Sequence, residues 1–277
     1  MSKNKIALVI GSGGIKCASA IGLWRVLLRE GIQPDLLVGC SAGSLYTSSI
    51  ALGFDVNTME ELTLKIWTEE IMKDYVSNLK ASQGGGLRFN ERSGLADDTY
   101  MNDQLSEVYS KYTFEDVNIP LQIVATDLNN GEQVSLSKGN IFDAIRASIA
   151  IPIIFPPHEI DGKLLTDGGA SDPLPVDVAI REGAQLIIAM GFTLSYRNRM
   201  RSLTAVQNQM TNIYMNNILK STFAFHNLAH HSEIVPFLPE FEEPLGMFDT
   251  DKLPDIIAVG EKTAEEQLPY IMRFLSE

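Results

Sequence analysis

Two short apolar runs near the N-terminus, at residues 6–10 and 36–38, each lead directly into a glycine-containing turn. The first turn spans residues 11–14 and precedes a helical pattern over residues 15–30. The second spans residues 39–43 and precedes a helix of small residues. Strands and helices that alternate in this way pair their strands in parallel and pack the helices against the sheet. The chain is therefore predicted to be an α/β protein.

The rest of the chain extends this pattern. Residues 55–118 are predicted to form helical cover, and the apolar runs at 121–126 and 186–191 are predicted to be core strands, the second of them the last. Residues 159–165 contain an Asp-Gly pair, which suits the positive φ angles of a type I′ turn and indicates a β-hairpin. No repeat, low-complexity tract or linker divides the 277 residues, so we expect a single domain over 1–277.

The charge and the cysteine content restrict partners and location. With 22 Lys and Arg against 35 Asp and Glu, the formal net charge of −13 disfavours a protein whose main work is to bind nucleic-acid phosphates. The N-terminus lacks the apolar region and the cleavage site of a signal peptide, and Cys17 and Cys40 are too few for a disulfide framework. We therefore expect a cytoplasmic protein without a nucleic-acid partner.

The second glycine turn has the sequence of a nucleophile turn. Gly39, Cys40, Ser41, Ala42 and Gly43 fit the pattern G-x-S-x-G, in which a strand turns sharply into a helix and the glycines remove side chains that would crowd the turn. The serine hydroxyl then lies at a helix N-terminus, where the dipole and the free N–H groups favour developing negative charge. A glycine-lined packing turn without chemistry has the same five-residue pattern.

The first glycine turn is a candidate oxyanion hole. Ser12, Gly13, Gly14, Ile15 and Lys16 follow the first strand, and consecutive glycines there can direct several backbone N–H groups into one concavity. A dinucleotide-binding fingerprint is the competing interpretation, but Lys16 stands where that pattern requires its third glycine.

A serine nucleophile needs a base, and the residues by themselves leave two kinds of candidate. Asp167 ends the second strand of the predicted hairpin, and Gly168 and Gly169 after it permit a close approach of backbone or substrate. A carboxylate that only caps its own turn would look the same. Chain order also permits a Ser-His-Asp triad that uses one of three downstream histidines, His226, His230 or His231.

The three motifs together resemble those of the patatin-like phospholipase family, and the similarity to its small bacterial members extends over nearly the whole chain. The family pattern has a glycine-rich loop after strand one, a G-x-S-x-G turn after strand two, and Asp-Gly-Gly or Asp-Gly-Ala well downstream. In this chain they correspond to residues 12–16, 39–43 and 167–169. Residues 147–157 also resemble the family's segment before the aspartate.

The resemblance implies a fold and a mechanism. The fold would have three layers, a mainly parallel central sheet covered by helices on both faces, with a catalytic core over about residues 5–195 and a C-terminal helical region over 196–277. The mechanism would use a Ser-Asp dyad without histidine, in which Ser41 is the nucleophile and Asp167 takes its proton directly. The substrate would be a phospholipid or another acyl ester, and neither a metal nor a cofactor is expected.

The resemblance also implies an oxyanion hole made by the N–H groups of Gly13, Gly14 and Ala42. The chain departs from the family pattern at two positions, because Ser12 replaces the first of three glycines and Cys17 replaces a glycine after the basic residue. Serine can still donate its backbone N–H, whereas the cysteine adds bulk near the turn. A non-catalytic lipid-binding protein is therefore an alternative, and an acyltransferase or thioesterase with the same dyad is another.

Residues 195–232 differ from the rest of this acidic chain. They hold Arg197, Arg199, Arg201 and Lys220 and no acidic residue. Apolar residues recur there at near-helical spacing, at Leu203, Val206, Met210, Ile213, Tyr214, Ile218 and Leu219. Transient contact with an anionic membrane surface is one interpretation, which would make the protein peripheral to a membrane. The more ordinary one, which the sequence favours, is an amphipathic helix packed on the core or on a subunit partner.

Overall fold

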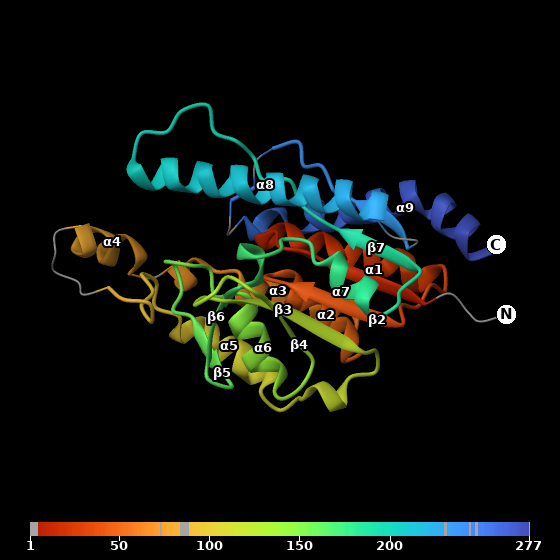
Figure 1. The fold of residues 1–277 in the computed structure, drawn as a ribbon, viewed down its shortest axis with the longest axis horizontal. Helices are drawn as coiled ribbons and strands as arrows, with labels where there is room; N and C mark the ends of the chain where they lie inside the picture. Colours follow the sequence, from red (N-terminus) through yellow and green to blue (C-terminus); the bar gives the residue numbers. More distant parts are fainter. Residues whose placement is uncertain are drawn as a thin grey trace.

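A computed structural model describes residues 5–72, 74–83, 89–229, 232–243, 245–246 and 249–276. Its centre is one sheet in the order β5-β6-β3-β2-β1-β7-β8, with β4 paired to β3 off this path (Figure 1). Five neighbouring strands are parallel: β3 (Leu121–Asp127), β2 (Leu36–Cys40), β1 (Ile6–Ile10), β7 (Leu186–Met190) and β8 (Glu233–Phe237). Three strands pair antiparallel: β4 (Gln133–Leu136), β5 (His158–Ile160) and β6 (Lys163–Asp167).

Helices cover both faces of the sheet, as predicted. One face carries α1 (Ser19–Arg29), α2 (Gly43–Ala51), α3 (Val56–Ile66), α5 (Thr99–Tyr109), α6 (Ile141–Ser148) and α9 (Leu253–Ser276). The other carries α7 (Val176–Arg181) and α8 (Leu203–Ala229), and α4 (Tyr75–Gln83) lies at the periphery (Figure 1). Short 3-10 helices are η1 (Gly14–Ala18), η2 (Glu69–Met72), η3 (Phe114–Asp116), η4 (Gly168–Ala170) and η5 (Thr250–Lys252).

Several predicted elements agree with the structure and two strands were not predicted. The hairpin of β5 and β6 turns through Asp161 and Gly162 with φ angles of 51° and 75°, as a type I′ turn requires. The predicted helix over 15–30 begins as η1 and continues as α1. β4 and β8 were missed, so residues 186–191 do not form the last core strand and residues 196–277 are not wholly helical. β8 contains Pro236, which weakens a strand prediction but fits a strand at the edge of the sheet.

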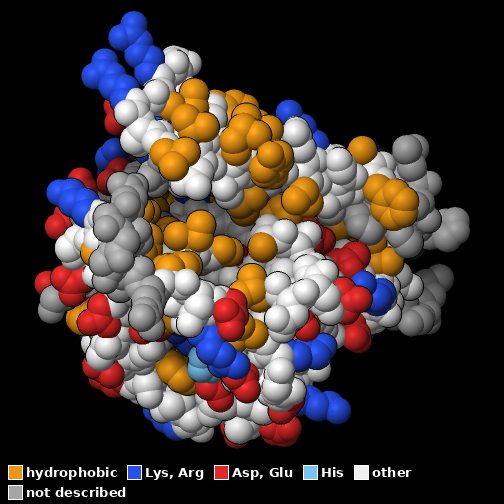
Figure 2. All heavy atoms as spheres, turned by 60° about the vertical axis from the view of Figure 1, so that its left-hand side comes forward, with side chains coloured by type: hydrophobic (Ala, Val, Ile, Leu, Met, Phe, Trp, Pro, Cys, Tyr) orange, Lys and Arg blue, Asp and Glu red, His pale blue; other side chains and the backbone are white. Residues whose placement is uncertain are grey.

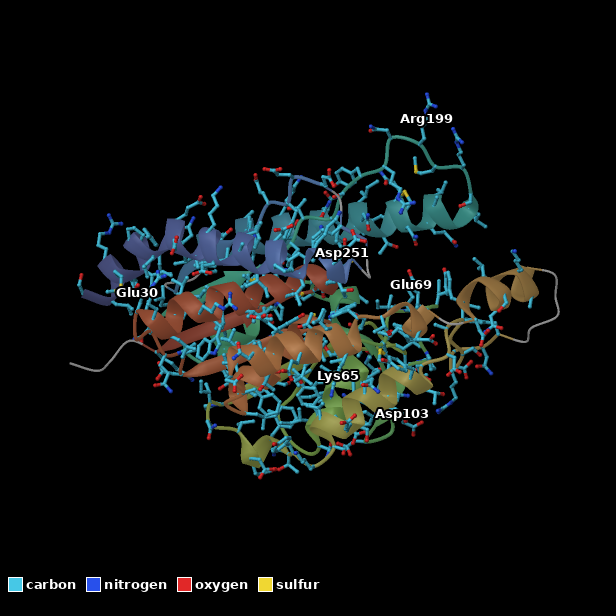
Figure 3. All side chains as sticks on the ribbon, turned by 180° about the vertical axis from the view of Figure 1, so that it is seen from behind. Glu30, Lys65, Glu69, Asp103, Arg199 and Asp251 are labelled. Carbon is cyan, nitrogen blue, oxygen red and sulfur yellow. The ribbon has the colours of Figure 1, made fainter. Side chains whose placement is uncertain are left out.

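Helix α8 extends past the body of the protein at its N-terminal end. There the large apolar side chains Leu203, Val206, Met210 and Tyr214 are exposed, whereas Leu219 further along packs into the core. The first half of the stripe therefore does not pack on the core of the same chain, and packing on a subunit partner, the other part of that expectation, stays a prediction. Figure 2 shows this end of the molecule, where hydrophobic side chains gather beneath projecting Lys and Arg side chains and a second group lies across a hollow. Arg199 projects from the loop before α8 (Figure 3).

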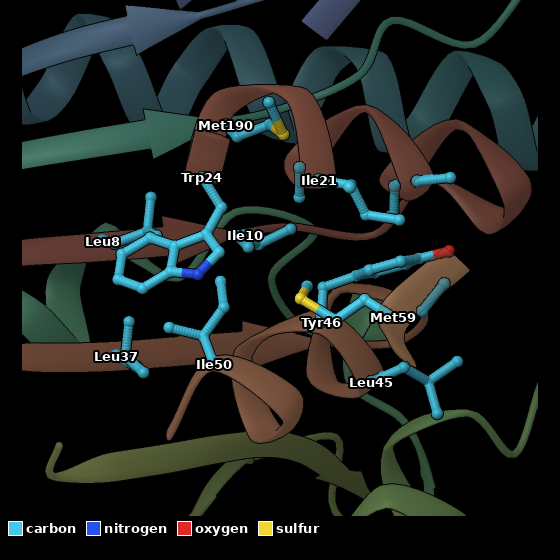
Figure 4. Close-up of a cluster of buried hydrophobic side chains, with 14 of the residues drawn as sticks. Leu8, Ile10, Ile21, Trp24, Leu37, Leu45, Tyr46, Ile50, Met59 and Met190 are labelled. Atoms are coloured by element: carbon cyan, nitrogen blue, oxygen red, sulfur yellow. The ribbon is translucent and has the colours of Figure 1, made fainter. Parts of the chain in front are cut away.

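The main core lies between β1, β2 and the helices α1, α2 and α3 (Figure 4). Leu8 and Ile10 of β1 point into this cluster, while the alternate residues Ala7 and Val9 pack against the opposite layer, so both faces of β1 are buried. This explains why the strand reads as a continuous apolar run. The rigid carboxyl ends of β1 and β2 are where the two glycine turns begin.

Candidate active site

The candidate site lies where two strands pair in succession with the same edge of β3. Cys40 at the end of β2 pairs with Val124, and Asp167 at the end of β6 pairs with the next residue, Ala125. β4 occupies the other edge of β3 opposite the same residues, so β2 and β6 must share one edge. Ser41 follows Cys40 directly. It therefore meets Asp167, although 126 positions separate them in the sequence.

Ser41 occupies a sharp turn between β2 and α2. Its φ angle is 53°, in the left-handed region that costs a non-glycine residue about 1–2 kcal/mol. The glycines on either side are required by close approach. A Cβ atom on Gly39 would lie 2.1 Å from Thr47 Oγ1, and one on Gly43 would lie 2.2 Å from the carbonyl oxygen of Ile10. The turn therefore fits only the residue pattern that the sequence provides.

The hydroxyl of Ser41 donates a hydrogen bond of 2.6 Å to Oδ2 of Asp167. The other carboxylate oxygen, Oδ1, accepts a hydrogen bond of 2.8 Å from the N–H of Gly169. Both side chains are buried. Burial raises the pKa of Asp167 to about 6, while the hydrogen bonds from Ser41 and Gly169 act in the opposite direction. At neutral pH the carboxylate is ionised and is placed to accept the proton of the serine.

The two glycines after Asp167 let this turn pack against its neighbours. A Cβ atom on Gly168 would lie 2.2 Å from the carbonyl oxygen of Val124 and 2.8 Å from Cys40 Sγ. One on Gly169 would lie 2.5 Å from Ser12 Oγ. The Asp-Gly-Gly segment is thus in contact with the end of β2 and with the first glycine turn. All three sequence motifs meet here.

Two buried hydroxyl groups that the sequence analysis did not assign hold the site in place. The N–H of Ser41 donates a hydrogen bond of 2.8 Å to Ser148 Oγ, and Ser148 donates in turn to the carbonyl oxygen of Val124 at 2.6 Å. Thr126 Oγ1 donates to the carbonyl oxygen of Asp167 at 2.9 Å. In the sequence, both residues could be recognised only as hydroxyl residues at or near the end of an apolar helix or strand. Their hydrogen-bond partners could not be predicted, because these depend on the register of β3.

Both glycine turns have backbone N–H groups for which the described residues provide no acceptor. Within the described ranges, no hydrogen-bond acceptor is found for the N–H groups of Gly13, Gly14 or Ala42. The N–H of Ser12, by contrast, donates to the carbonyl oxygen of Pro173 at 2.8 Å. The expectation that this N–H is free to donate elsewhere is therefore wrong.

Lys16 ties the first glycine turn to the segment that follows β7. Its ammonium group donates to the carbonyl oxygen of Thr193 at 3.1 Å and lies over the ring of Phe241. Burial lowers the pKa of Lys16. The ring of Phe192 covers Gly13, where a Cβ atom would lie 2.4 Å from the ring. Lys16 therefore has a structural role at the turn.

Ser41 bonds Asp167 directly, and among the described side chains no histidine lies between them. Nε2 of His158 lies 2.9 Å from Oδ1 of Asp143. The side chain of His226 and the whole of His230 and His231 lie outside the described residues. Among the residues that are described, no three His, Cys, Asp or Glu side chains form a group that could hold a metal ion, and we assign no residue to a cofactor.

The two cysteines and a second carboxylate lie around the dyad. Cys17 Sγ donates to the carbonyl oxygen of Gly11, and Cys40 Sγ lies 3.2 Å from Ser12 Oγ. Burial raises the pKa of both thiols, so both are neutral at physiological pH. Burial also raises the pKa of Asp172 to about 6, against a hydrogen bond from the N–H of Leu174. Two carboxylates at this site therefore have similarly raised pKa values.

Comparison with known proteins identifies the family. The family model described as Patatin-like phospholipase matches residues 8–180, a range that includes all three motifs. This is more than half of the chain, and the chain therefore belongs to the patatin-like phospholipase family. None of the helices formed by the described residues is long and apolar enough to cross a membrane.

Individual relatives are consistent with this family. An uncharacterized NTE family protein of Mycobacterium bovis is 30% identical over 231 residues, which is 82% of this chain and 59% of that protein. Patatin-like phospholipase domain-containing protein 7 of Rattus norvegicus is 29% identical over 192 residues, which is 69% of this chain and 14% of that protein. The chain thus spans less than two thirds of the length of either relative.

A solved structure shares the fold. The crystal structure of VipD from Legionella pneumophila superimposes with a TM-score of 0.53 at 15% sequence identity, over 97% of this chain and 67% of that one. This likeness shows that an α/β architecture with helices on both faces of the sheet also occurs in an experimentally determined structure.

Proposed function

We propose that the protein is a serine-dependent lipid acyl hydrolase of the phospholipase A or esterase type, in which Ser41 is the nucleophile and Asp167 is the base. The observation that carries the proposal is the 2.6 Å hydrogen bond from Ser41 Oγ to Asp167 Oδ2 at a strained turn between a strand and a helix. A buried serine next to an ionised carboxylate is the arrangement that activates a hydroxyl nucleophile.

The reaction has two steps. Ser41 Oγ attacks the carbonyl carbon of the acyl ester, and its proton moves to Asp167 Oδ2. The N–H groups of Gly13, Gly14 and Ala42 stabilise the oxyanion that forms. When the intermediate collapses, Asp167 returns the proton to the leaving alcohol and an acyl-serine remains. Asp167 then takes a proton from water as the water oxygen attacks the acyl-serine. When the bond between the acyl carbon and Ser41 Oγ breaks, Asp167 returns the proton to Oγ, and a fatty acid is released.

The pKa of Asp167 suits this role. A carboxylate with its ordinary pKa of 3.8 is a weak base, and burial strengthens it by raising the pKa to about 6. The group is still ionised at neutral pH. Asp167 can therefore accept the serine proton and return it within one cycle.

The lipid substrate class is supported by the family. The family is described as patatin-like phospholipase, and the name of the rat relative contains the same term. The pattern departures at Ser12 and Cys17 do not argue against chemistry, because the side chains of both residues are engaged within the fold. An acyltransferase or thioesterase would use the same dyad, and these alternatives differ in acceptor or acyl donor.

Product analysis tests the proposal. The protein would be incubated with a mixed panel of phospholipids and acyl thioesters, with and without an added alcohol acceptor, and the products identified by mass spectrometry. Free fatty acid and lysophospholipid are expected, and both should be absent with Ser41→Ala. Transfer of the acyl chain to the alcohol in place of release, or turnover of thioesters alone, would contradict the hydrolase assignment. Equal turnover by Ser41→Ala would contradict the site itself.

A further inference from the structure

One face of the first half of α8 is apolar and uncovered. Leu203, Val206, Met210 and Tyr214 are 70%, 43%, 39% and 58% exposed. Their spacing of three, four and four residues places them on a single face of the helix. A group of large apolar side chains on one exposed face indicates an interaction site, whereas isolated exposed apolar residues do not.

The orientation of this face is fixed by the polar side of the same helix. Asn216 is buried and bonds both the N–H and the carbonyl oxygen of Leu194, each at 2.8 Å. Asn212 donates to the carbonyl oxygen of Ser195 at 2.9 Å, and Gln209 accepts from the N–H of Arg197 at 2.9 Å. Residues 209, 212 and 216 lie on one face, so the helix is held by that face and its apolar face stays uncovered.

The loop before α8 adds positive charge at the same end of the molecule. Arg197, Arg199 and Arg201 are exposed, and within the described part of the chain none of them has an ion-pair partner. No acidic residue lies in residues 195–232, although the chain as a whole has a net charge of −13. Figure 3 shows Arg199 at the outer tip of this loop.

The helix that carries this surface also reaches the candidate active site. Further along α8, the terminal methyl group of Met215 lies against Gly169, two residues after Asp167. The segment between β7 and α8 is also close to the first glycine turn, because the ammonium group of Lys16 donates a hydrogen bond to the carbonyl oxygen of Thr193. At 1.5 Å per residue, the twelve residues from Met215 to Leu203 span about 18 Å, so α8 connects the neighbourhood of the dyad with the exposed tip. Met215 lies on a different side of the helix from the four exposed apolar residues.

From these observations we infer that an anionic lipid bilayer is the partner of this surface. We name it the α8 docking surface and define it as Leu203, Val206, Met210 and Tyr214 together with Arg197, Arg199 and Arg201. The apolar side chains enter the boundary between headgroups and acyl chains, and the guanidinium groups bind lipid phosphates. The inference rests on the proposed lipid hydrolase function, because it explains how a buried dyad obtains a substrate from a membrane.

Charge distinguishes a bilayer from a second copy of the chain. A two-fold symmetric dimer through this face would place the same patch of each copy against the other. Residues 195–232 contain no acidic residue, so the patch of the second copy would offer the arginines no charge partner. An anionic bilayer satisfies the arginines and the apolar face together.

Vesicle flotation with the full chain tests the inference. Ser41→Ala serves as the background, so that lipid turnover does not affect binding, and the probes are phosphatidylcholine vesicles with and without phosphatidylserine. We expect binding to the vesicles that contain phosphatidylserine. Replacing Arg197, Arg199 and Arg201 together by Gln should weaken it about 100-fold, and Leu203→Ser with Tyr214→Ser should weaken it roughly tenfold. Lys65, Lys111 and Lys138, exposed elsewhere, form the matched control when replaced together by Gln, and that variant should bind like the background.

The outcomes separate this inference from the proposed function. For the activity assays the same arginine and Leu203/Tyr214 substitutions are made in the natural chain, which keeps Ser41. These variants should lose hydrolysis of vesicle phospholipid but keep hydrolysis of a soluble short-chain ester. Equal binding by the arginine variant and the lysine control would overturn the inference, as would equal binding to both vesicle types. A dimer in sedimentation that Leu203→Ser with Tyr214→Ser dissociates, without any vesicle binding, would also overturn it in favour of a second copy. If the natural chain binds the vesicles as expected but does not hydrolyse the soluble ester, the proposed Ser41–Asp167 chemistry is contradicted and the membrane-binding inference is supported.

Discussion

Ser41 is held in a left-handed backbone conformation by its neighbours on all sides. Its N–H bonds Ser148, its hydroxyl bonds Asp167, and the glycines at positions 39 and 43 admit the close contacts of the turn. Asp167 is buried in the same place, where its charge is unfavourable. At the scale of the residue, the site therefore combines a strained serine, the proposed nucleophile, with a buried carboxylate, the proposed base, and both features have measurable consequences.

The strain at Ser41 can be measured with two inactive variants. Ser41→Ala and Ser41→Gly both remove the hydroxyl and should both abolish ester hydrolysis. Glycine adopts a φ of 53° freely and alanine does not, so Ser41→Gly should have a free energy of unfolding about 1 kcal/mol higher than Ser41→Ala. Chemical denaturation of the two variants gives this difference. A more stable alanine variant would show that the turn is not strained in solution.

The pKa of Asp167 predicts a pH profile. The base must be ionised, so kcat/KM for a soluble ester should fall about tenfold per pH unit below an inflection near pH 6. Asp172 has a pKa raised to the same value, and Asp172→Asn is therefore the control. That variant should keep the inflection if Asp167 is its source. If Asp172→Asn loses the inflection, the titrating group is Asp172, and the assignment of the pH profile to Asp167 is contradicted.

The burial of Asp167 also makes the free energy of unfolding depend on pH. The dependence has the opposite sign to that of a salt-bridged carboxylate, whose pKa is lowered by folding. The folded protein binds the proton of Asp167 more tightly than the unfolded chain, so the free energy of unfolding should fall as pH rises from 3.8 to about 6. Asp172 contributes in the same direction. Asp167→Asn should be inactive and should lose less stability over this interval than the natural chain.

At the scale of the elements, the site depends on strand β3. β2 and β6 end against the same edge of β3, and α6 contributes Ser148, whose hydroxyl links the Ser41 turn to the carbonyl oxygen of Val124. Three elements therefore fix the position of Ser41, the proposed nucleophile. A change at Ser148 tests this link without touching either member of the dyad.

Ser148→Ala removes the acceptor of the Ser41 N–H and the donor to Val124. It should lower the free energy of unfolding by about 1–3 kcal/mol and lower kcat with little change in KM, because the nucleophile loses its support. Ser48 provides a matched control: it is also a buried helical serine, but its hydroxyl has no partner within the described residues. Ser48→Ala should therefore keep both stability and activity. Similar effects from the two substitutions would show that the Ser148 hydrogen bonds do not position the turn.

At the scale of the whole molecule, the sequence was sufficient to predict those elements that depend on local residue patterns. The parallel core strands, the helical cover and the Asp-Gly hairpin each depend on a few adjacent residues. β8 was missed because Pro236 interrupts a short run at the sheet edge. The residues alone left the choice between a dyad and a triad open. The proximity of Ser41 and Asp167 depends on the register of β3, which no local pattern specifies. The sequence also left open what covers the first half of α8, because periodicity does not show what lies opposite a helix face.

The most direct test of the dyad is covalent labelling of the whole protein with a fluorophosphonate probe. Peptide mass spectrometry should locate the adduct on Ser41 in the natural chain. No adduct should form in Ser41→Ala, and labelling should be slowed by orders of magnitude in Asp167→Asn. A variant with alanine at His226, His230 and His231 should label at the natural rate. A folded natural chain that resists the probe, an adduct on another serine, or full labelling of Asp167→Asn would contradict the account.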